Sequence, residues 1–369
     1  MPGGVNRVLL FSTNWPEYMI ELANGLSKLC NVALVLPTNH KLTSSHIALI
    51  SNQVTFFPFE VVFHRSIRDN LKMGLTLRRI IHSFNPDVLH IQANGHKWFA
   101  FIYWSLRIKP IIINTIHDPY IHTGDQLSLK NRDNWSKRIA KRFTKRYIVH
   151  GKKLKNELVK HYSLKNVSCV DVIPHGHFGI YKRLQNKQAY EEPGTILFFG
   201  RLWEYKGLKY FIEAANVLAE NGKKYKYVIA GEGEEFEKYR KMISYPDQFE
   251  IHNYRIPIEN AGLFFQRASI IILPYIDASQ SGIIPVAFAY GKPVVVTNVG
   301  SLPEVVSNEV DGLIVRSRDT DQLIKAIERL MENEKFRVEL GKNAKIKANT
   351  LLSWERIAKL TMASYLAAR

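Results

Sequence analysis

A short loop from Gly200 to Gly207 combines glycines with two cations in a pattern suited to binding an anion. The loop follows the apolar run Ile196–Phe199 and precedes an amphipathic stretch, so it is expected to connect a strand to a helix. A helix N-terminus presents N–H groups to an anion, and Arg201 and Lys206 add a planar donor fork and a point charge. A solvated Arg and Lys on an exposed loop would have the same pattern.

A second loop in the same half, Asp277–Gly282, consists mostly of small polar residues. It follows the apolar run Ile270–Leu273 and opens an expected helix over residues 283–290. Because parallel strands send their carboxyl ends to one edge of a sheet, the two loops are expected to approach one ligand. Ser279 or Ser281 could equally be an ordinary helix cap, and capping is compatible with binding.

Short apolar runs alternate with amphipathic stretches along the chain. Strands are expected in the first half at Val8–Phe11, Val32–Leu36, Val54–Phe57, Val88–Ile91, Ile111–Thr115, Tyr147–Val149 and Val170–Ile173. Helices are expected there at Glu17–Leu29, Asp69–Phe84 and Lys97–Leu106. The second half continues with strands at Ile196–Phe199, Tyr227–Ala230, Ile270–Leu273, Pro293–Thr297 and Leu313–Val315. Repeated strand–helix–strand units predict parallel sheets covered by helices on both faces.

The 369 residues suit two domains. The polar stretch 181–194 is the expected linker between a domain over 1–180 and a second over 195–348. The remaining residues, 349–369, contain an amphipathic helix that is expected to pack back toward the N-terminal domain. Two doubly wound halves would place a ligand cleft between them.

The formal net charge of +18 lies mainly in residues 1–180, which hold 24 Lys and Arg against 10 Asp and Glu. Three Lys-Arg pairs recur every four residues over 137–146 and would form one basic stripe on a helix. A cytoplasmic membrane surface attracts such a stripe by about 1 kcal/mol per residue. A nucleic acid is not expected, because Trp135, Phe143 and Tyr147 have the spacing of packed helical residues.

Two cysteines, Cys30 and Cys169, are too few for a disulfide framework and are expected to be buried thiols. Neither a signal-peptide pattern nor an apolar run near the roughly 20 residues of a membrane helix is evident. The expected location is the cytoplasm, with peripheral attachment to the inner face of the membrane.

The second half resembles family 4 of the retaining nucleotide-sugar glycosyltransferases, which have the GT-B fold. The matching segments are Gly200-Arg201…Lys206-Gly207, Ala230–Gly233, Leu273–Tyr275, Ala289–Val295, Gly300–Glu304 and Asp311–Leu313. The resemblance implies two Rossmann-like domains facing a central cleft, with the acceptor on the first domain and the nucleotide sugar on the second. It implies no required cofactor and no bound metal.

In that family the residues matching Arg201 and Lys206 hold the donor diphosphate, and the segment matching Tyr254, Arg255 and Ile256 lies against the base. The donor site implied by the resemblance also includes Gly200, Glu232, Ser279, Gln280, Ser281, Gly282 and Ile283. The family also has a His near the donor sugar's hydroxymethyl group. His117 matches it, at the end of an expected strand, although a lone His is usually a satisfied structural residue.

This chain departs from the family at two glutamates that normally lie eight positions apart. The second, which holds the ribose hydroxyls in the family, falls at Val286, and the first falls at Ala278. Asp277 is a candidate replacement for the first, and ribose recognition is expected to differ. The Ser279–Gly282 variant resembles a subgroup of polysaccharide-building transferases.

Other segments give weaker indications of a ligand site. Asn14-Trp15-Pro16 could line an acceptor pocket, although a capping Asn and a packed Trp explain it equally well. His122 and Asp118 are weaker candidates, either for acceptor contact or for fixing the geometry of the loop. Gly231-x-Gly233 lacks the third glycine of a dinucleotide fingerprint, and Asp319-Thr320-Asp321 is expected to cap a helix rather than bind metal.

The expected function is therefore transfer of a hexose, with retained configuration, to a glycan or lipid-linked acceptor in polysaccharide or exopolysaccharide synthesis. UDP-glucose is the expected donor, with galactose, N-acetylglucosamine and GDP-mannose open. The alternatives are a GT-B-fold nucleotide-sugar epimerase, a non-catalytic sugar-nucleotide sensor and a nucleic-acid-binding protein.

Overall fold

The computed structural model describes residues 4–38, 42–61, 66–92, 110–119, 141–185 and 187–369. The chain forms two compact units. Unit 1 comprises Met1–Pro119, Leu127–Pro174 and Trp354–Arg369; unit 2 comprises Tyr120–Gln126 and His175–Ser353. The expected helix at Lys97–Leu106, residues 137–140 of the expected basic stripe, and His122 lie outside the described residues.

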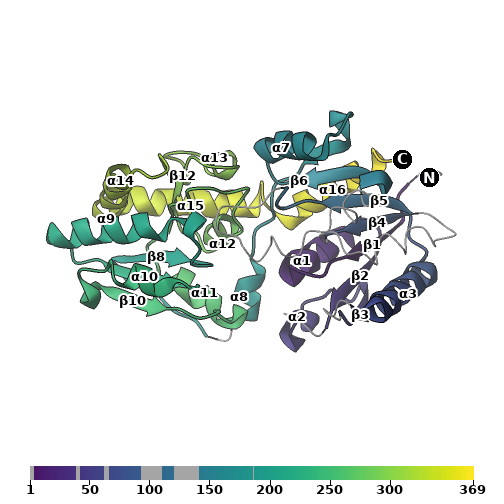
Figure 1. Cartoon of the computed structure of the whole chain (residues 1–369), viewed down its shortest axis with the longest axis horizontal. Coiled ribbons are helices and arrows are strands. Elements are labelled where there is room, and N and C mark those ends of the chain that lie inside the picture. The colour runs from purple at the N-terminus through teal and green to yellow at the C-terminus, as the bar shows by residue number, and fades with distance from the viewer. Residues whose placement is uncertain (1–3, 39–41, 62–65, 93–109, 120–140, 186) are drawn as a thin grey trace. The chain divides into compact units, whose positions relative to one another are not determined.

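Unit 1 is built on a parallel sheet with the strand order β3-β2-β1-β4-β5-β6-β7 (Figure 1). Its strands are β1 (Arg7–Phe11), β2 (Asn31–Pro37), β3 (Val54–Phe59), β4 (Val88–Ile91), β5 (Ile111–Thr115), β6 (Thr144–Val149) and β7 (Val170–Val172). Its helices are α1 (Pro16–Leu26), α2 (Ser44–Ala48), α3 (Ile67–Phe84), α7 (Lys152–Tyr162) and α16 (Trp354–Leu366). Strand order reverses between β1 and β4, which places a topological switch point at their carboxyl ends.

The apolar runs form these strands because both faces of the sheet are covered. In β1, all residues from Val8 to Phe11 are fully buried. Leu9 and Phe11 belong to a core cluster that α3 completes with Met73, Leu77, Ile81 and Phe84. These four α3 residues recur at the spacing of one helical face, as the sequence predicted for this amphipathic stretch.

Helix α16 packs against α1 within unit 1, although more than 300 residues separate them in the sequence. Gly25 permits the close approach, since a Cβ there would lie 2.8 Å from the Trp354 carbonyl oxygen. The Tyr365 hydroxyl bonds to His90 Nδ1 at 2.7 Å, and His90 Nε2 lies 2.7 Å from Thr115 Oγ1. This chain of bonds attaches the C-terminal helix to the centre of the sheet.

Unit 2 has a parallel sheet with the order β10-β9-β8-β11-β12-β13. The strands are β8 (Thr195–Phe199), β9 (Lys226–Ala230), β10 (Phe249–His252), β11 (Ile270–Leu273), β12 (Val294–Thr297) and β13 (Gly312–Val315). The helices are α8 (Ile180–Leu184), α9 (Leu208–Glu220), α10 (Phe236–Arg240), α11 (Ile258–Arg267), α12 (Ile283–Ala289), α13 (Leu302–Val305), α14 (Thr320–Glu332) and α15 (Glu334–Asn349). Here the switch point lies between β8 and β11.

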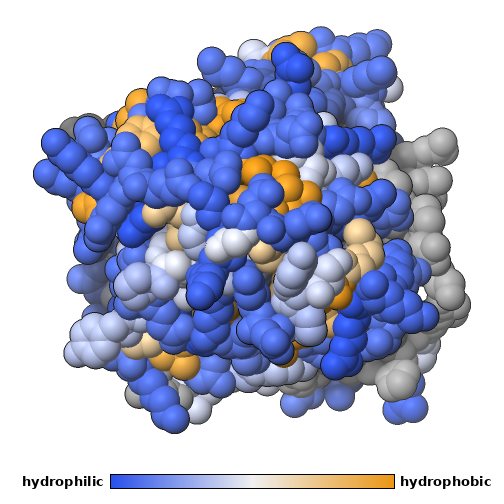
Figure 2. All heavy atoms as spheres, turned by 90° about the vertical axis from the view of Figure 1, so that its left-hand side faces the viewer, coloured by the Kyte–Doolittle hydropathy of each residue, from blue (hydrophilic) through white to orange (hydrophobic). Residues whose placement is uncertain are grey.

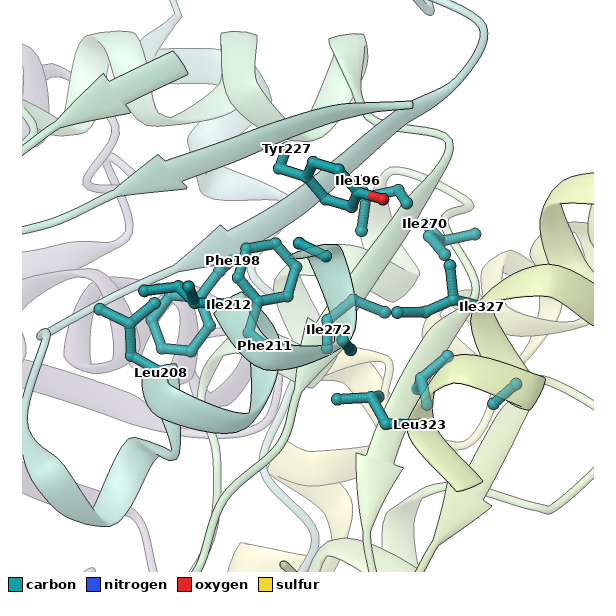
Figure 3. Close-up of a cluster of buried hydrophobic side chains, with 14 of the residues drawn as sticks. Ile196, Phe198, Leu208, Phe211, Ile212, Tyr227, Ile270, Ile272, Leu323 and Ile327 are labelled. Carbon is teal, nitrogen blue, oxygen red and sulfur yellow. The ribbon is translucent and has the colours of Figure 1, made fainter. Parts of the chain in front are cut away.

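The core on one face of this sheet joins β8 and β11 to helices α9 and α14. Figure 3 shows Phe198 beside Phe211 of α9, and Ile272 directed toward Leu323 and Ile327 of α14. Strand β10 was not expected from the sequence, because Phe249–His252 alternates with polar residues and is only half-buried at the edge of the sheet.

Two other segments differ from the sequence expectations. The stretch 181–194 includes most of α8, and Gln185 bonds to Gln266 of α11 at 2.7 Å, so this stretch packs on unit 2. Lys145 and Arg146 lie in strand β6, so the predicted helical stripe is wrong for this pair. Arg146 donates hydrogen bonds to both carboxylate oxygens of Asp171 in β7. This bidentate ion pair forms because β6 is paired with β7 in the sheet.

The face shown in Figure 2 is mostly hydrophilic, and its apolar residues lie in separate small groups. Within the described part of the chain, no helix has the length and hydropathy required to cross a bilayer.

The buried histidines of unit 1 predict an acid-sensitive fold. Burial, and then the proximity of His150, lowers the pKa of His90 to about 3, and burial lowers the pKa of His150 to about 4. Their stabilising contribution is complete above the unfolded value of 6.5. As pH falls below 6.5 the unfolded chain binds protons that the folded chain excludes, so the unfolding free energy decreases until the folded pKa values are reached.

We expect His90 alone to remove roughly 2 kcal/mol of the unfolding free energy between pH 7 and pH 5. Denaturant titrations at both pH values should give a smaller loss for His90→Gln than for the wild type. His82→Gln, an exposed change on α3, is the control and should retain the wild-type loss. Equal losses in all three proteins would contradict this account.

Candidate functional site

The loops after β8 and β11 meet at the switch point of unit 2. The backbone N–H groups of Ile276 and Asp277 donate to the carbonyl oxygen of Tyr205, at 2.8 and 3.4 Å. A Cβ at Gly200 would lie 4.0 Å from the side chain of Ile283, the residue that opens α12. The two loops therefore contact each other within unit 2.

Two glycines make this arrangement possible. Gly207 has φ +70°, and a Cβ there would lie 1.9 Å from the carbonyl oxygen of Pro274. Gly231 has φ +150°, and its Cβ would lie 1.9 Å from the carbonyl oxygen of Gly200. Any side chain would overlap with backbone at either position, and the positive φ values favour glycine as well. Gly207 and Gly231 therefore permit close contacts between the backbones of neighbouring loops.

The two cations project from the loop after β8 and lie over aromatic rings. The guanidinium of exposed Arg201 is 3.9 Å from the centre of the Trp203 ring, and Lys206 Nζ is 3.8 Å from the centre of the Tyr275 ring. Burial raises the pKa of Tyr275, so the ring remains a neutral phenol under Lys206. Such contacts are worth about 0.5–2 kcal/mol and orient a flexible cation.

The phenol of Tyr275 also connects the cations to the segment Ser279–Gly282, which is called the serine loop below. Its hydroxyl lies 3.1 Å from Ser281 Oγ, and Ser281 Oγ accepts the Ile283 N–H at 3.3 Å. The N-cap of α12 is Gly282, so neither Ser279 nor Ser281 is the helix cap that the sequence allowed, and Ser281 contacts the first turn from one residue further out. Lys206, Tyr275 and Ser281 form a continuous group at the carboxyl edge of the sheet.

A further loop, after β12, closes on the serine loop. Ser279 is fully buried, and its carbonyl oxygen accepts the Ser301 N–H at 3.0 Å. Gln280 has a buried Oε1 with no hydrogen-bond partner among the described residues. Asp277 is half-buried next to this loop. A buried amide oxygen without a donor favours the approach of a ligand hydroxyl or N–H group.

The loops after β9 and β10 lie next to this group. Glu232 is exposed, and its carbonyl oxygen accepts the Leu202 N–H at 2.8 Å. Asn253 Oδ1 accepts the Gly233 N–H at 3.0 Å and connects the two loops. Tyr254 follows with 51% of its surface exposed, together with exposed Arg255 and half-buried Ile256. An exposed aromatic ring at this position can stack on a planar base.

Val286 is only 2% exposed and lies among the buried residues of α12. A carboxylate at this position would be removed from water, with a large desolvation cost unless it were paired. The structure thus contains an apolar residue where the resemblance implies a ribose-binding glutamate.

The second group of candidates lies in unit 1, where His117 follows β5. His117 is 9% exposed, and its Nε2 lies 2.6 Å from Nε2 of Gln92. The ring of His150 is centred 4.7 Å away, and His150 Nδ1 bonds to the carbonyl oxygen of Ile173 at 2.9 Å. Because the pKa of His150 is lowered by burial, this ring is neutral at physiological pH.

Sequence reasoning missed Gln92, His150 and Tyr275. Gln92 and His150 directly follow β4 and β6 at the edge that carries His117, so their position after a predicted strand could have identified them. Tyr275 was recognised only as part of a matching segment. The expected cap at Asp319 is confirmed, since its Oδ1 accepts the Gln322 N–H at 2.9 Å.

Comparisons with known proteins agree with this architecture. The model for "Glycosyltransferase Family 4" matches residues 17–177, and the model for "Glycosyl transferases group 1" matches residues 182–347. The chain is 26% identical to a D-inositol 3-phosphate glycosyltransferase of Pseudarthrobacter chlorophenolicus, over 76% of this chain and 71% of that protein.

A UDP-Gal:alpha-D-GlcNAc-diphosphoundecaprenol alpha-1,3-galactosyltransferase of Escherichia coli is 23% identical over 76% of each chain. An uncharacterized glycosyltransferase of Methanocaldococcus jannaschii is 29% identical, but the match spans 47% of this chain and only 45% of that protein. Among solved structures, Anabaena HepE in complex with UDP-glucose has a TM-score of 0.69, with 16% identity over 99% of this chain and 100% of that one.

The two family models match adjacent segments that together span most of the chain; the first contains β2–β7 of one parallel sheet, and the second contains β8–β13 of the other. The chain therefore belongs to family 4 of the glycosyltransferases and has the GT-B fold.

Proposed function

We propose that the protein transfers a hexose from a nucleoside diphosphate sugar, with UDP-glucose as the preferred donor, to a glycan or lipid-linked acceptor in polysaccharide or exopolysaccharide synthesis. The observation that carries the proposal is the position of Arg201 and Lys206 at the switch point of unit 2, next to the Ser279–Gly282 loop. A diphosphate needs cations and donor groups that converge, and this edge of the sheet supplies both.

The choice of donor and acceptor draws on the relatives. HepE, with the same fold, was solved with UDP-glucose. The name of the Escherichia coli relative describes a UDP-sugar donor and an acceptor on diphosphoundecaprenol. These matches support a UDP-sugar donor and make a lipid-linked acceptor a reasonable choice for this chain.

In the proposed reaction, the bond between the sugar's anomeric carbon and the diphosphate oxygen breaks, and negative charge accumulates on the leaving diphosphate. Arg201 and Lys206 stabilise that charge without a bound metal. The acceptor hydroxyl attacks from the same face, its proton passes to a leaving phosphate oxygen, and the configuration is retained. His117 and Asp277 are the proposed additional active-site residues.

In the proposed donor complex, Tyr254, Arg255 and Ile256 contact the base. Glu232, Gly200 and the segment Ser279–Ile283 surround the diphosphate and sugar. The ribose is held differently from the family pattern, since Val286 has no hydrogen-bonding group. The same valine is compatible with a non-catalytic sensor of sugar nucleotides, and a sensor would bind UDP-glucose without consuming it.

The first test removes each cation separately. Arg201→Ala and Lys206→Ala should each lower donor turnover by about 10²–10³-fold, because each removes a donor aimed at the developing charge. Thermal unfolding should change little, since both side chains lie in a surface loop. Lys209→Ala, which removes an exposed cation just beyond the same loop, is the matched control and should retain activity.

Turnover is measured as release of UDP from UDP-glucose, with and without a glycan acceptor. Near-wild-type turnover in both Arg201→Ala and Lys206→Ala would refute the assignment. Binding of UDP-glucose with no turnover in the wild type would favour the sensor.

A second test addresses the close approach that fixes the loop. Gly207→Ala places a methyl group against the Pro274 carbonyl oxygen and should lower the affinity for UDP at least tenfold by displacing Lys206. Gly222→Ala is the matched control, because Gly222 also has positive φ, +78°, but a Cβ there meets nothing within 4 Å. Both changes carry the left-handed backbone cost of about 1–2 kcal/mol. Equal UDP affinity in the two variants, measured by calorimetry, would contradict the role of this contact.

We also propose that the protein is cytoplasmic and associates peripherally with the inner face of the membrane. Of the described residues in the basic segment, Arg146 is paired with Asp171, whereas Arg142 and Lys145 are exposed. We expect flotation with liposomes containing anionic lipid, and weaker flotation of a variant with Arg142→Gln and Lys145→Gln. The Arg329→Gln and Lys359→Gln double variant controls for net charge. Absence of any preference for anionic liposomes would contradict the proposal.

A further inference from the structure

The carboxyl ends of β1 and β4 lie side by side in unit 1, with Phe11 paired to Ile91. The Gln92 N–H donates to the Phe11 carbonyl oxygen at 2.9 Å, so Gln92 lies directly next to the end of β1. Ser12 Oγ donates to the Gln92 carbonyl oxygen at 2.9 Å and accepts the Asn14 N–H at 3.1 Å. These bonds hold the segment after β1 at a switch point, the position where doubly wound sheets bind ligands.

Trp15 has a conformation at this point that its residue type does not favour. Its φ of 61° and ψ of 53° lie in the left-handed region, and it precedes Pro16 at the first position of α1. A bulky residue is an outlier there, and a following proline normally selects extended backbone. Such strain is concentrated at ligand sites. In addition, 45% of the Trp15 surface is exposed, so burial in the core does not account for this residue.

The indole ring lies against the polar group that contains His117. Its centre is 5.6 Å from the centre of the His117 ring, and the two rings are tilted by 36°. Gln92 is 4% exposed, and its Nε2 is 2.6 Å from His117 Nε2. The Oε1 atom of Gln92 is buried and has no hydrogen-bond partner among the described residues. His117 thus has on one side an amide whose oxygen lacks a partner among the described residues, and it also contacts a partly exposed indole ring.

These surfaces match the two kinds of surface on a pyranose. A pyranose has an apolar face of C–H groups, which packs on aromatic rings, and a rim of hydroxyl groups, which donate and accept hydrogen bonds. We propose that Trp15 and Gln92 join His117 in a pyranose subsite of unit 1. The indole contacts the C–H face, and the Gln92 amide oxygen accepts a hydrogen bond from a ring hydroxyl. This inference rests on the proposed function, because the pyranose belongs either to the donor or to the acceptor.

The experiment compares Trp15→Gly and Trp15→Phe with the wild type. Calorimetry measures affinity for UDP and for UDP-glucose, and saturation-transfer NMR measures binding of methyl glycosides of glucose, galactose and N-acetylglucosamine. Tyr190→Ala is the control, since Tyr190 is an aromatic residue that is 87% exposed outside unit 1.

We expect Trp15→Gly to retain UDP affinity within twofold. If the pyranose is the donor's, this variant loses at least tenfold in affinity for UDP-glucose; if it is the acceptor's, the glycoside signals of the wild type disappear. Trp15→Phe should lie within threefold of the wild type in both assays. Trp15→Gly should also melt at or above the wild-type temperature, because glycine tolerates the left-handed backbone.

Gln92→Leu tests the amide separately and should weaken the same ligand that Trp15→Gly weakens. Unchanged UDP-glucose affinity in Trp15→Gly, together with unchanged or absent glycoside signals, would overturn the subsite. Failure of the wild type to bind UDP at all would instead refute the proposed function.

Discussion

The parallel pairing of β8 with β11 is the constraint on which the candidate donor site depends. Ile196 and Ile270 are paired in register, so the two strands end at the same edge of the sheet. The chain turns away from these two strands in opposite directions, because β9 lies beyond β8 and β12 lies beyond β11. No connection between strands crosses the edge where the loops after β8 and β11 meet. Arg201 and Lys206 approach Ser281 only because of this pairing.

The same topology in unit 1 carries a different chemistry. Its switch-point edge contains buried neutral groups, including His150 with a pKa lowered to about 4, whereas the corresponding edge of unit 2 contains cations over aromatic rings. A diphosphate requires positive charge, and an uncharged sugar requires hydrogen bonds and apolar surface. The proposed division of roles between the units would follow from which side chains terminate the strands, since the sheets themselves are alike in strand order.

The sequence predicted the elements whose signal is local. Buried strands such as Ile270–Leu273 are continuous apolar runs, and the loops after them contain glycines that a close backbone approach requires. Strand β10 was missed because an edge strand needs fewer apolar residues. The strand at Lys145-Arg146 was misread as a helix because its partner, Asp171, is 25 residues away. The spacing of residues along the sequence does not reveal an ion pair such as Arg146–Asp171, whose members become neighbours only when the sheet forms.

The site residues likewise divide into those with a local sequence signal and those without one. Arg201 and Lys206 could be identified because their motif is contiguous, whereas Gln92 contacts His117 across 25 residues and became visible only in the folded unit. The strained Trp15 backbone is likewise absent from any pattern of residue types. Selection for stability alone would place glycine or asparagine at this position, because both adopt the left-handed conformation more easily. A tryptophan at this position costs stability, and the proposed contact of its exposed ring with a pyranose gives that cost a function.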